Sequence, residues 1–208
     1  MSEFARAVLA ILAWLGLTQL GSFVSHRPPG SFDLSAAPLI GQDVPLAVFF
    51  TRAGTFPVYA VLCVALLTFG FVRRAWLLPA IVSVVTLIAT WRLSDLVKDV
   101  FGRPRISHWV AIHETSSSYP SGHAALSLTF YGLWIYFIAR SDLSTALRRV
   151  IAALLIAWIA AIGWSRLALG AHYPTDLLGG YLLAVVALCV AITVYARLDR
   201  RIAVTRRG

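Results

Sequence analysis

Two histidines stand where so apolar a chain would not ordinarily carry a titratable group. His123 lies in SYPSGHAALS, at the mouth of a long apolar run, and His172 lies in SRLALGAHYPTD, four residues before Asp176. Near neutral pH an imidazole can donate or accept a proton, and it can attack an electrophile when a neighbouring carboxylate fixes its tautomer. Either histidine alone could equally be an ordinary interfacial group, so the neighbouring residues decide the interpretation.

The stretch YPSGH predicts a helix start that binds an anion. Proline is favoured at the first helical position, so we expect Tyr119 as the cap and Ser121, Gly122 and His123 in the first turn. The first N–H groups of a helix have no internal partner and carry partial positive charge. Gly122 lets a ligand approach the backbone, and His123 would stand beside it with a proton to give. The alternative is a histidine behind a plain Pro-Ser cap.

Two further stretches carry charged residues that could bind or act on an anion. KDVFGRPR places Lys98, Arg103 and Arg105 within eight residues, and these cations repel one another unless they are solvated or face an anion. Pro104 prevents a continuous helix through Arg103. The alternative is a generic basic loop that flanks a membrane span.

The stretch SRLALGAHYPTD follows an apolar run that ends near Arg166. Pro174 is expected to open the next helix, which leaves His172 in the preceding loop and puts Asp176 in the first turn, where a carboxylate is favoured. Asp176 could then accept a hydrogen bond from the His172 ring and leave the other ring nitrogen free as a nucleophile. The alternative is a capping aspartate beside an unrelated histidine.

The elements that must position these residues are membrane helices. The chain is 59% hydrophobic, only 13% charged, and has a mean hydropathy of +0.79, which is too apolar for an ordinary soluble domain. A membrane span needs about 20 apolar residues. We therefore predict an all-α fold, a six-transmembrane-helix bundle that forms one domain over residues 1–208. The six charge-free runs are Ala7–Ser25, Ala53–Val72, Ala75–Trp91, Ala124–Ala139, Val150–Ser165 and Leu177–Ala196.

The first apolar run and the connection that follows it lead to two further predictions. The run resembles a signal peptide, but it lacks a small-x-small cleavage site and is long for one, so we interpret it as a helix. The connection that follows contains Pro28, Pro29 and Gly30 and then becomes apolar, which indicates a loop and a short interfacial helix before the second span. Residues 28–52 could be a lid over a lipid site or simple surface packing.

The net charge of +9 reflects membrane topology rather than nucleic-acid binding, because the basic residues lie between and beyond the apolar runs. With six spans both termini share one side, which holds eleven arginines, against seven basic residues on the other side. The positive-inside rule then places both termini in the cytoplasm and the chemically active stretches on the outer face. The basic tail either lies against anionic headgroups or simply anchors the topology. Cys63 and Cys189 fall inside predicted spans and are expected as buried thiols.

Together the three stretches supply cations, a helix N-terminus, two histidines and one carboxylate on one predicted side. Cations and backbone N–H groups bind a tetrahedral oxyanion, while one histidine attacks phosphorus and the other protonates the leaving oxygen. Such chemistry needs no metal, and the sequence has neither a carboxylate cluster nor a spaced Cys/His set to hold one.

These motifs resemble the type 2 phosphatidic acid phosphatase superfamily, which includes lipid phosphate phosphatases and vanadium haloperoxidases. The resemblance rests on Lys98-x6-Arg105, Pro120-Ser121-Gly122-His123 and Ser165-Arg166-x5-His172-x3-Asp176. It implies that Lys98, Arg105, Ser121, Gly122 and Arg166 bind phosphate, that His172 is the nucleophile, that His123 is the general acid, and that Asp176 orients His172. Two positions depart from the family pattern: Ile106 stands where a proline is usual, and Tyr119 where a phenylalanine is common.

The expected activity is the hydrolysis of phosphate from a membrane lipid through a phosphohistidine, without cofactor or metal and with a bell-shaped pH profile. The expected location is the bacterial inner membrane, with the site facing the periplasm. Undecaprenyl diphosphate, phosphatidylglycerol phosphate, phosphatidic acid and lipid A phosphates all fit such a site. One alternative is a phospholipid transporter or flippase that only binds the phosphate. Another is vanadate-dependent halide oxidation, whose enzymes are typically soluble. The expected partners are a lipid phosphate and the membrane, with no nucleic acid.

Overall fold

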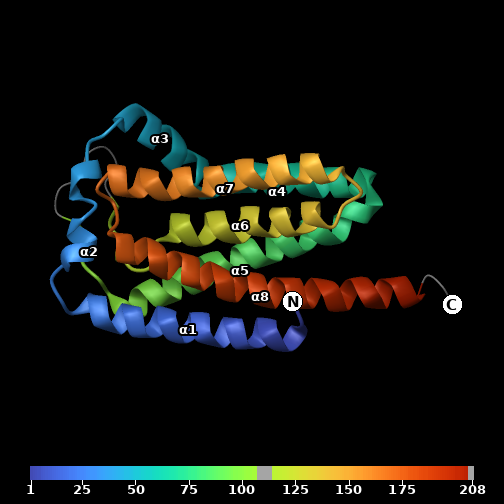
Figure 1. The fold of residues 1–208 in the computed structure, drawn as a ribbon, viewed down its shortest axis with the longest axis horizontal. Coiled ribbons are helices and arrows are strands. Elements are labelled where there is room, and N and C mark those ends of the chain that lie inside the picture. Colours follow the sequence, from blue (N-terminus) through green and yellow to red (C-terminus); the bar gives the residue numbers. More distant parts are fainter. Residues whose placement is uncertain (107–113, 206–208) are drawn as a thin grey trace.

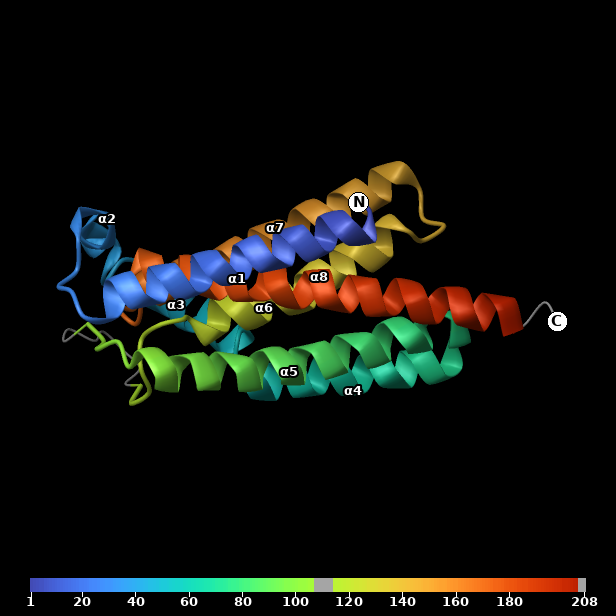
Figure 2. The same ribbon diagram turned by 90° about the horizontal axis from the view of Figure 1, so that it is seen from below.

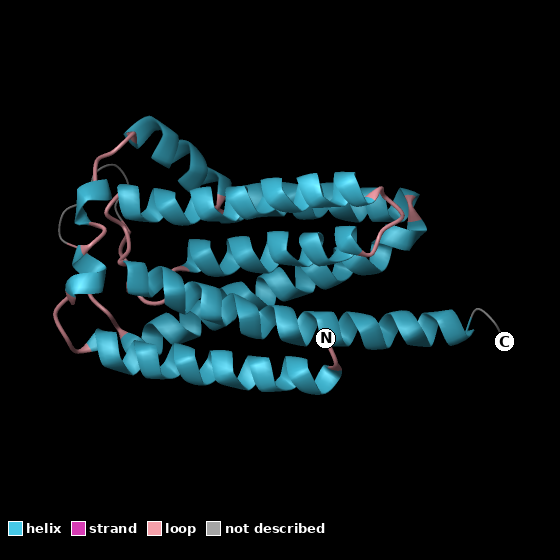
Figure 3. Ribbon diagram, viewed as in Figure 1, coloured by secondary structure: helices cyan, strands magenta, loops and turns pink. Residues whose placement is uncertain are grey.

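The computed structural model describes residues 1–106 and 114–205, and every regular element in these ranges is helical (Figures 1 and 3). The expected all-α fold is therefore confirmed for this part of the chain. The elements are α1 Glu3–Ser25, α2 Ser31–Leu34, η1 Ala37–Leu39, α3 Val44–Ala53, α4 Phe56–Val72, η2 Arg74–Trp76, α5 Leu77–Phe101, α6 Gly122–Ala139, α7 Thr145–Ala168 and α8 Pro174–Thr205.

The long helices run side by side along one axis, while α2 and α3 lie at one end of the bundle (Figures 1 and 2). Five segments are long and apolar enough to cross a membrane, namely α1, η2 with α5, α6, α7 and α8. The segment Ser31–Leu39 and α3 would make a sixth if counted together, although they meet at a bend of 115°. Helix α4 is apolar but has only 17 residues. The described part of the chain thus offers five or six candidate spans.

Helix α6 is the centre of the bundle, where it packs against α5, α7 and α8. Its neighbours join it through a core that includes Tyr59, Leu87, Phe130 and Ile162. The outward faces of the helices are apolar too, with Val61 and Leu154 about two-thirds exposed. A helix that is hydrophobic all round needs an apolar surrounding on its outer face, as a membrane provides.

Helix α5 extends well beyond the apolar run that predicted it. The run was expected to end at Trp91, whereas the helix continues through Phe101 and therefore carries Lys98 in its last turn. It ends at Gly102, which adopts the left-handed conformation (φ 58°) typical of a helix C-terminus, and Pro104 follows. Lys98 is thus fixed by a helix instead of lying in the outer loop.

The start of α6 corrects the prediction made for YPSGH. The cap is Ser121 and not Tyr119, and Pro120 lies before the helix, joined to Tyr119 by a cis peptide bond. The Ser121 hydroxyl accepts a hydrogen bond from the Ala124 N–H at 3.4 Å. A serine hydroxyl can satisfy a free N–H group at a helix start, which a tyrosine side chain cannot do there, and this local bond decides the boundary.

The other local predictions agree with the structure. Helix α8 begins at Pro174, so Asp176 lies in its first turn and His172 in the preceding loop. Both Cys63 and Cys189 are buried free thiols. The connection between α1 and α4 is more structured than expected, since it contains α2, η1 and α3. Helix α3 packs Ala47 against the end of α7.

Candidate active site

One end of the bundle collects every residue that the sequence singled out. There α5 and α7 end while α6 and α8 begin, and the connection with α2 and α3 lies beside them (Figure 1). This arrangement follows from helices that alternate in direction, because consecutive antiparallel helices bring the end of one next to the start of the following one. The residues placed at this end are Lys98, Arg105, Ser121, Gly122, His123, Arg166, His172 and Asp176.

Two of the expected phosphate ligands converge on a carboxylate that the sequence analysis overlooked. Arg105 Nη2 donates to Glu114 Oε2 at 2.8 Å, and Arg166 Nη2 donates to Glu114 Oε1. Arg166 is fully buried and also donates to the Thr51 hydroxyl on α3. Burial alone would raise the pKa of Glu114, but the attraction of Arg166 and Arg105 prevails and lowers that pKa to about 2. The two guanidinium groups therefore hold an anion in this structure.

Lys98 lies beside the first turn of α6. Its Nζ donates to the Ser116 hydroxyl at 3.2 Å, and a Cβ added to Gly122 would lie 4.0 Å from the same nitrogen. The absence of a side chain at Gly122 leaves the helix N-terminus open beside this ammonium group. A cation and free backbone N–H groups at one place favour an anionic ligand.

His172 is oriented by an arginine on one ring nitrogen and a carboxylate near the other. Arg105 Nη1 lies 3.3 Å from Nε2, and because a guanidinium can only donate, Nε2 must be the unprotonated nitrogen. Nδ1 lies 3.4 Å from Asp176 Oδ2 but makes no hydrogen bond with the described residues, so the expected bond is seen only as a close contact. Burial lowers the pKa of His172 to about 4, against the opposing effect of Asp176. The ring is therefore neutral at neutral pH, as a nucleophile must be.

The Asp176 side chain is buried and held by hydrogen bonds on both of its carboxylate oxygens. Its carboxylate accepts hydrogen bonds from the Ser118 hydroxyl, from the Tyr173 N–H at 2.8 Å and from Arg103 Nη1. Its backbone carbonyl accepts the Ser121 N–H at 2.9 Å, which ties the start of α8 to the start of α6. Arg103, expected with the other cations, thus pairs with Asp176 and is not open to a ligand.

His123 presents a buried Nε2 that has no hydrogen-bond partner among the described residues. The charges of Arg166, Glu114 and Lys98 all act on its ring. Its position depends on Gly54 between α3 and α4, because a Cβ there would lie only 2.8 Å from the His123 ring carbon Cδ2. An unpartnered buried nitrogen is costly unless a ligand supplies its partner.

The sequence analysis missed Glu114, Ser116, Gly54 and Thr51. Glu114 had one readable signal, since an acidic residue between a cluster of cations and a histidine motif is a natural counter-ion. The others carry no such signal, because serine, glycine and threonine occur throughout apolar helices and loops.

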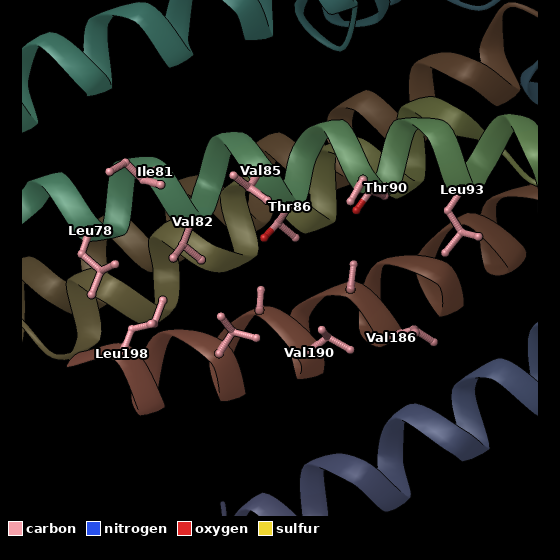
Figure 4. A pocket seen from close by; sticks show the side chains of 14 residues that line it. Leu78, Ile81, Val82, Val85, Thr86, Thr90, Leu93, Val186, Val190 and Leu198 are labelled. Carbon is pink, nitrogen blue, oxygen red and sulfur yellow. The ribbon is translucent and has the colours of Figure 1, made fainter. Parts of the chain in front are cut away.

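A large apolar groove lies elsewhere, between the middle parts of α5 and α8 (Figure 4). It has a volume of about 370 Å³, and its lining includes Ile81, Val85, Val190 and Val194. No charged or titratable residue lines it, so it contributes no chemistry. Its outward-facing apolar walls are of the kind that lipid chains cover.

Comparison with known proteins identifies the family of the chain. The sequence profile of the PAP2 superfamily matches residues 59–200, which include all three motifs. The chain belongs to this superfamily. Phosphatidylglycerophosphatase B of Bacillus subtilis (strain 168) is 26% identical over 178 residues, which cover 85% of this chain and 73% of that protein. The Escherichia coli (strain K12) protein named "Putative undecaprenyl-diphosphatase YbjG" is 26% identical over 164 residues, 76% of this chain and 77% of its own.

Two solved structures share the fold of this PAP2 protein. The crystal structure of the first transmembrane PAP2 type phosphatidylglycerolphosphate phosphatase from Bacillus subtilis has a TM-score of 0.78 at 19% identity, covering 93% of this chain and 96% of that one. The crystal structure of Aquifex aeolicus LpxE has a TM-score of 0.55 at 19% identity, covering 85% and 94%. These likenesses confirm an integral membrane fold of the PAP2 type.

Glu114 predicts a measurable competition with phosphate. We expect Glu114→Gln to lower the inhibition constant of orthovanadate, a phosphate mimic, by roughly fivefold to tenfold at pH 7, because the two arginines then lose a charged competitor. The control is Asp142→Asn, an exposed carboxylate in the turn between α6 and α7 at the opposite end of the bundle. Weaker vanadate inhibition in Glu114→Gln would show that Glu114 helps to bind the anion instead of competing with it.

Proposed function

We propose that this PAP2 protein removes phosphate from a membrane lipid through a phosphohistidine on His172, without a metal ion. The observation that carries the proposal is the anion held between Arg105 and Arg166 next to Nε2 of His172. A substrate phosphate that replaces the Glu114 carboxylate there would have its phosphorus within reach of a neutral imidazole nitrogen. Cations placed to meet charge as it develops are a principal source of catalytic power.

The proposed reaction has two steps. In the first, His172 Nε2 attacks phosphorus, the bond from phosphorus to the lipid oxygen breaks, and His123 gives its proton to that oxygen. In the second, water attacks the phosphohistidine while His123 takes up a proton, and inorganic phosphate leaves with both histidines restored. Lys98, Arg105 and Arg166, with the N–H groups at the start of α6, neutralise the phosphoryl oxygens throughout. Asp176 keeps Nδ1 of His172 protonated and thereby keeps Nε2 unprotonated.

The proposed membrane arrangement has six crossings, made by α1, α4, α5, α6, α7 and α8, within one domain over residues 1–208. The start of α1 and the end of α8 lie toward the end of the bundle opposite the site, as an even number of crossings requires (Figure 1). Helix α3 would then lie at the interface beside the site. The excess of arginines on the side of the termini supports a cytoplasmic location for the termini and a site on the periplasmic face of a bacterial inner membrane.

The substrate is a phosphate-bearing lipid of the kind named for the two relatives, a phosphatidylglycerol phosphate or an undecaprenyl diphosphate. Phosphatidic acid remains a third candidate, because the site recognises the phosphate itself.

The test is phosphate release by the detergent-solubilised protein from a panel of phosphatidylglycerol phosphate, undecaprenyl diphosphate, phosphatidic acid and a lipid A phosphate. We expect release from at least one lipid at a rate that EDTA leaves unchanged, because two histidines and three cations supply the nucleophile, the acid and the charge. A transporter or flippase that only binds the phosphate releases none. A strict requirement for Mg²⁺ would contradict the proposed mechanism.

A further inference from the structure

Asp33 belongs to none of the three motifs, yet its carboxylate is buried against the site. It lies on the four-residue helix α2, in the connection between α1 and α4. Only 6% of the residue is exposed, which is unusual for an aspartate on a short surface segment. A buried carboxylate is costly unless it is paired and hydrogen-bonded, so its partners indicate its role.

The partners of Asp33 are Arg103 and Thr175. Arg103 Nη2 donates to Asp33 Oδ2 at 2.7 Å, and Asp33 Oδ1 accepts the Thr175 N–H at 3.1 Å and the Thr175 hydroxyl at 2.7 Å. Arg103 Nη1 in turn donates to Thr175 Oγ1 at 2.7 Å and to Asp176 Oδ1 at 2.5 Å. One guanidinium therefore bridges two carboxylates that come from α2 and α8.

The bridge between the two carboxylates fixes the orientation of the Arg103 guanidinium and pairs its charge. An arginine side chain is flexible, but a guanidinium held on both of its terminal nitrogens by carboxylates has one orientation. Arg103 is 3% exposed and stacks on the Tyr173 ring, 4.4 Å from its centre, so no solvent or ligand can replace Asp33 as its second anion. Without Asp33, Nη2 of Arg103 would lose its acceptor, and the guanidinium would be held at Nη1 alone and free to turn relative to Asp176.

We propose that Asp33 is a positioning residue for the phosphatase reaction, acting through Arg103 to hold the Asp176 carboxylate toward His172. The inference rests on the proposed function. The inference also gives the connection between α1 and α4 a role. Its helix α2 is hydrogen-bonded to the start of α8 and thereby helps to hold the residues that orient His172. Asp33 touches neither His172 nor the place of the phosphate, so its loss should affect turnover more than substrate binding.

The test is Asp33→Asn, which replaces one carboxylate oxygen by an NH2 group, so that the remaining oxygen cannot accept from both Arg103 and Thr175. We expect kcat to fall about tenfold and KM to stay within about twofold, because the phosphate ligands are untouched while His172 is misoriented. Asp33→Glu, which keeps the charge, should recover part of the loss. The matched control is Asp43→Asn in the same connection, where an exposed aspartate only caps α3 through the Leu46 N–H.

A double-mutant comparison tests whether Asp33 acts through Arg103. In an Arg103→Gln background, Asp33→Asn should change kcat by less than about twofold, since the connection to Asp176 is already broken. A tenfold loss that is repeated in that background would overturn the inference, as would an unchanged kcat in Asp33→Asn alone. A rise in KM with an unchanged kcat would likewise contradict a positioning role.

Two further measurements keep the outcomes distinct. A wild-type protein that releases no phosphate from any lipid contradicts the proposed function, whereas an active wild type with a fully active Asp33→Asn variant contradicts only this inference. If Asp33→Asn does not fold in detergent, Thr175→Val removes the hydroxyl that bonds to both Asp33 and Arg103 while keeping the side-chain shape. We expect a loss of kcat of several-fold there, and an unchanged kcat would overturn the inference.

Discussion

Replacing His172 with alanine is expected to lower kcat for phosphate release by about 10⁶-fold, the loss seen when the catalytic nucleophile of a serine protease is removed. The variant keeps the cations that bind phosphate but has no nitrogen to form the covalent intermediate. The ring is buried at the junction of three groups, Arg105, Asp176 and the Ala171 carbonyl that also binds Arg105. No other described imidazole can take that place.

The measurement combines steady-state rates with detection of the intermediate. Wild-type protein mixed with ³²P-labelled lipid and quenched in alkali should retain label as phosphohistidine, and His172→Ala should retain none. His26→Ala is the control, because His26 is exposed at the end of α1 and contacts no residue of the site. Full phosphatase activity in a folded His172→Ala protein, or label that persists in it, would disprove the covalent mechanism.

Replacing His123 with alanine should cost about 10²- to 10⁴-fold in kcat on a lipid substrate, the range of a general acid. A lipid alkoxide is a poor leaving group and needs the proton that His123 gives. A nitrophenolate leaves without a proton, so the first step on p-nitrophenyl phosphate should be at least tenfold less affected. The buried, unpartnered Nε2 of His123 is the atom that would face the leaving oxygen.

The second step gives this prediction a separate readout. If His123 also activates the water, the variant should form phosphohistidine from p-nitrophenyl phosphate faster than it hydrolyses it. Stopped-flow absorbance should then show a burst of nitrophenolate close to one equivalent per enzyme, followed by a slow phase. Equal losses on the lipid and on the nitrophenyl ester, with no burst, would assign His123 to phosphate binding instead of proton transfer.

Local signals in the sequence determined most of the fold. Long runs without charge can satisfy their backbone polar groups inside a membrane only as helices, which is why each of the six runs is helical over nearly all of its length; the exception is the second run, in which Gly54 and Thr55 separate α3 from α4. Pro174 and Asp176 placed the start of α8 correctly, because a proline and an acidic residue both favour the first turn. The error at α6 was local as well: Ser121 caps the helix through its own hydroxyl, a bond that outweighs the preference of Pro120 for the first turn.

The motifs also determined which residues would meet, since consecutive antiparallel helices bring the end of one next to the start of another. For each stretch the sequence left an alternative: a plain helix cap, a generic basic loop or a capping aspartate unrelated to the histidine. These alternatives are less favoured because the predicted site residues lie together at one end of the bundle, namely Lys98, Arg105, His123, Arg166 and His172. Their roles in the reaction stay predictions until the variants are measured.

Only the tertiary structure determined which charged residues form ion pairs with one another. Arg103 stands in the sequence as one more cation beside Lys98 and Arg105, but it pairs with Asp33, seventy residues away, and with Asp176, seventy-three away. The position of Glu114 in the sequence suggests a counter-ion, but only the fold shows that its partners are Arg105 and Arg166, one on each carboxylate oxygen. Helix and cap signals act over a few residues and can be read from the chain, whereas a buried ion pair depends on how distant elements pack, because the cost of burying each charge must be offset by a partner from elsewhere in the fold.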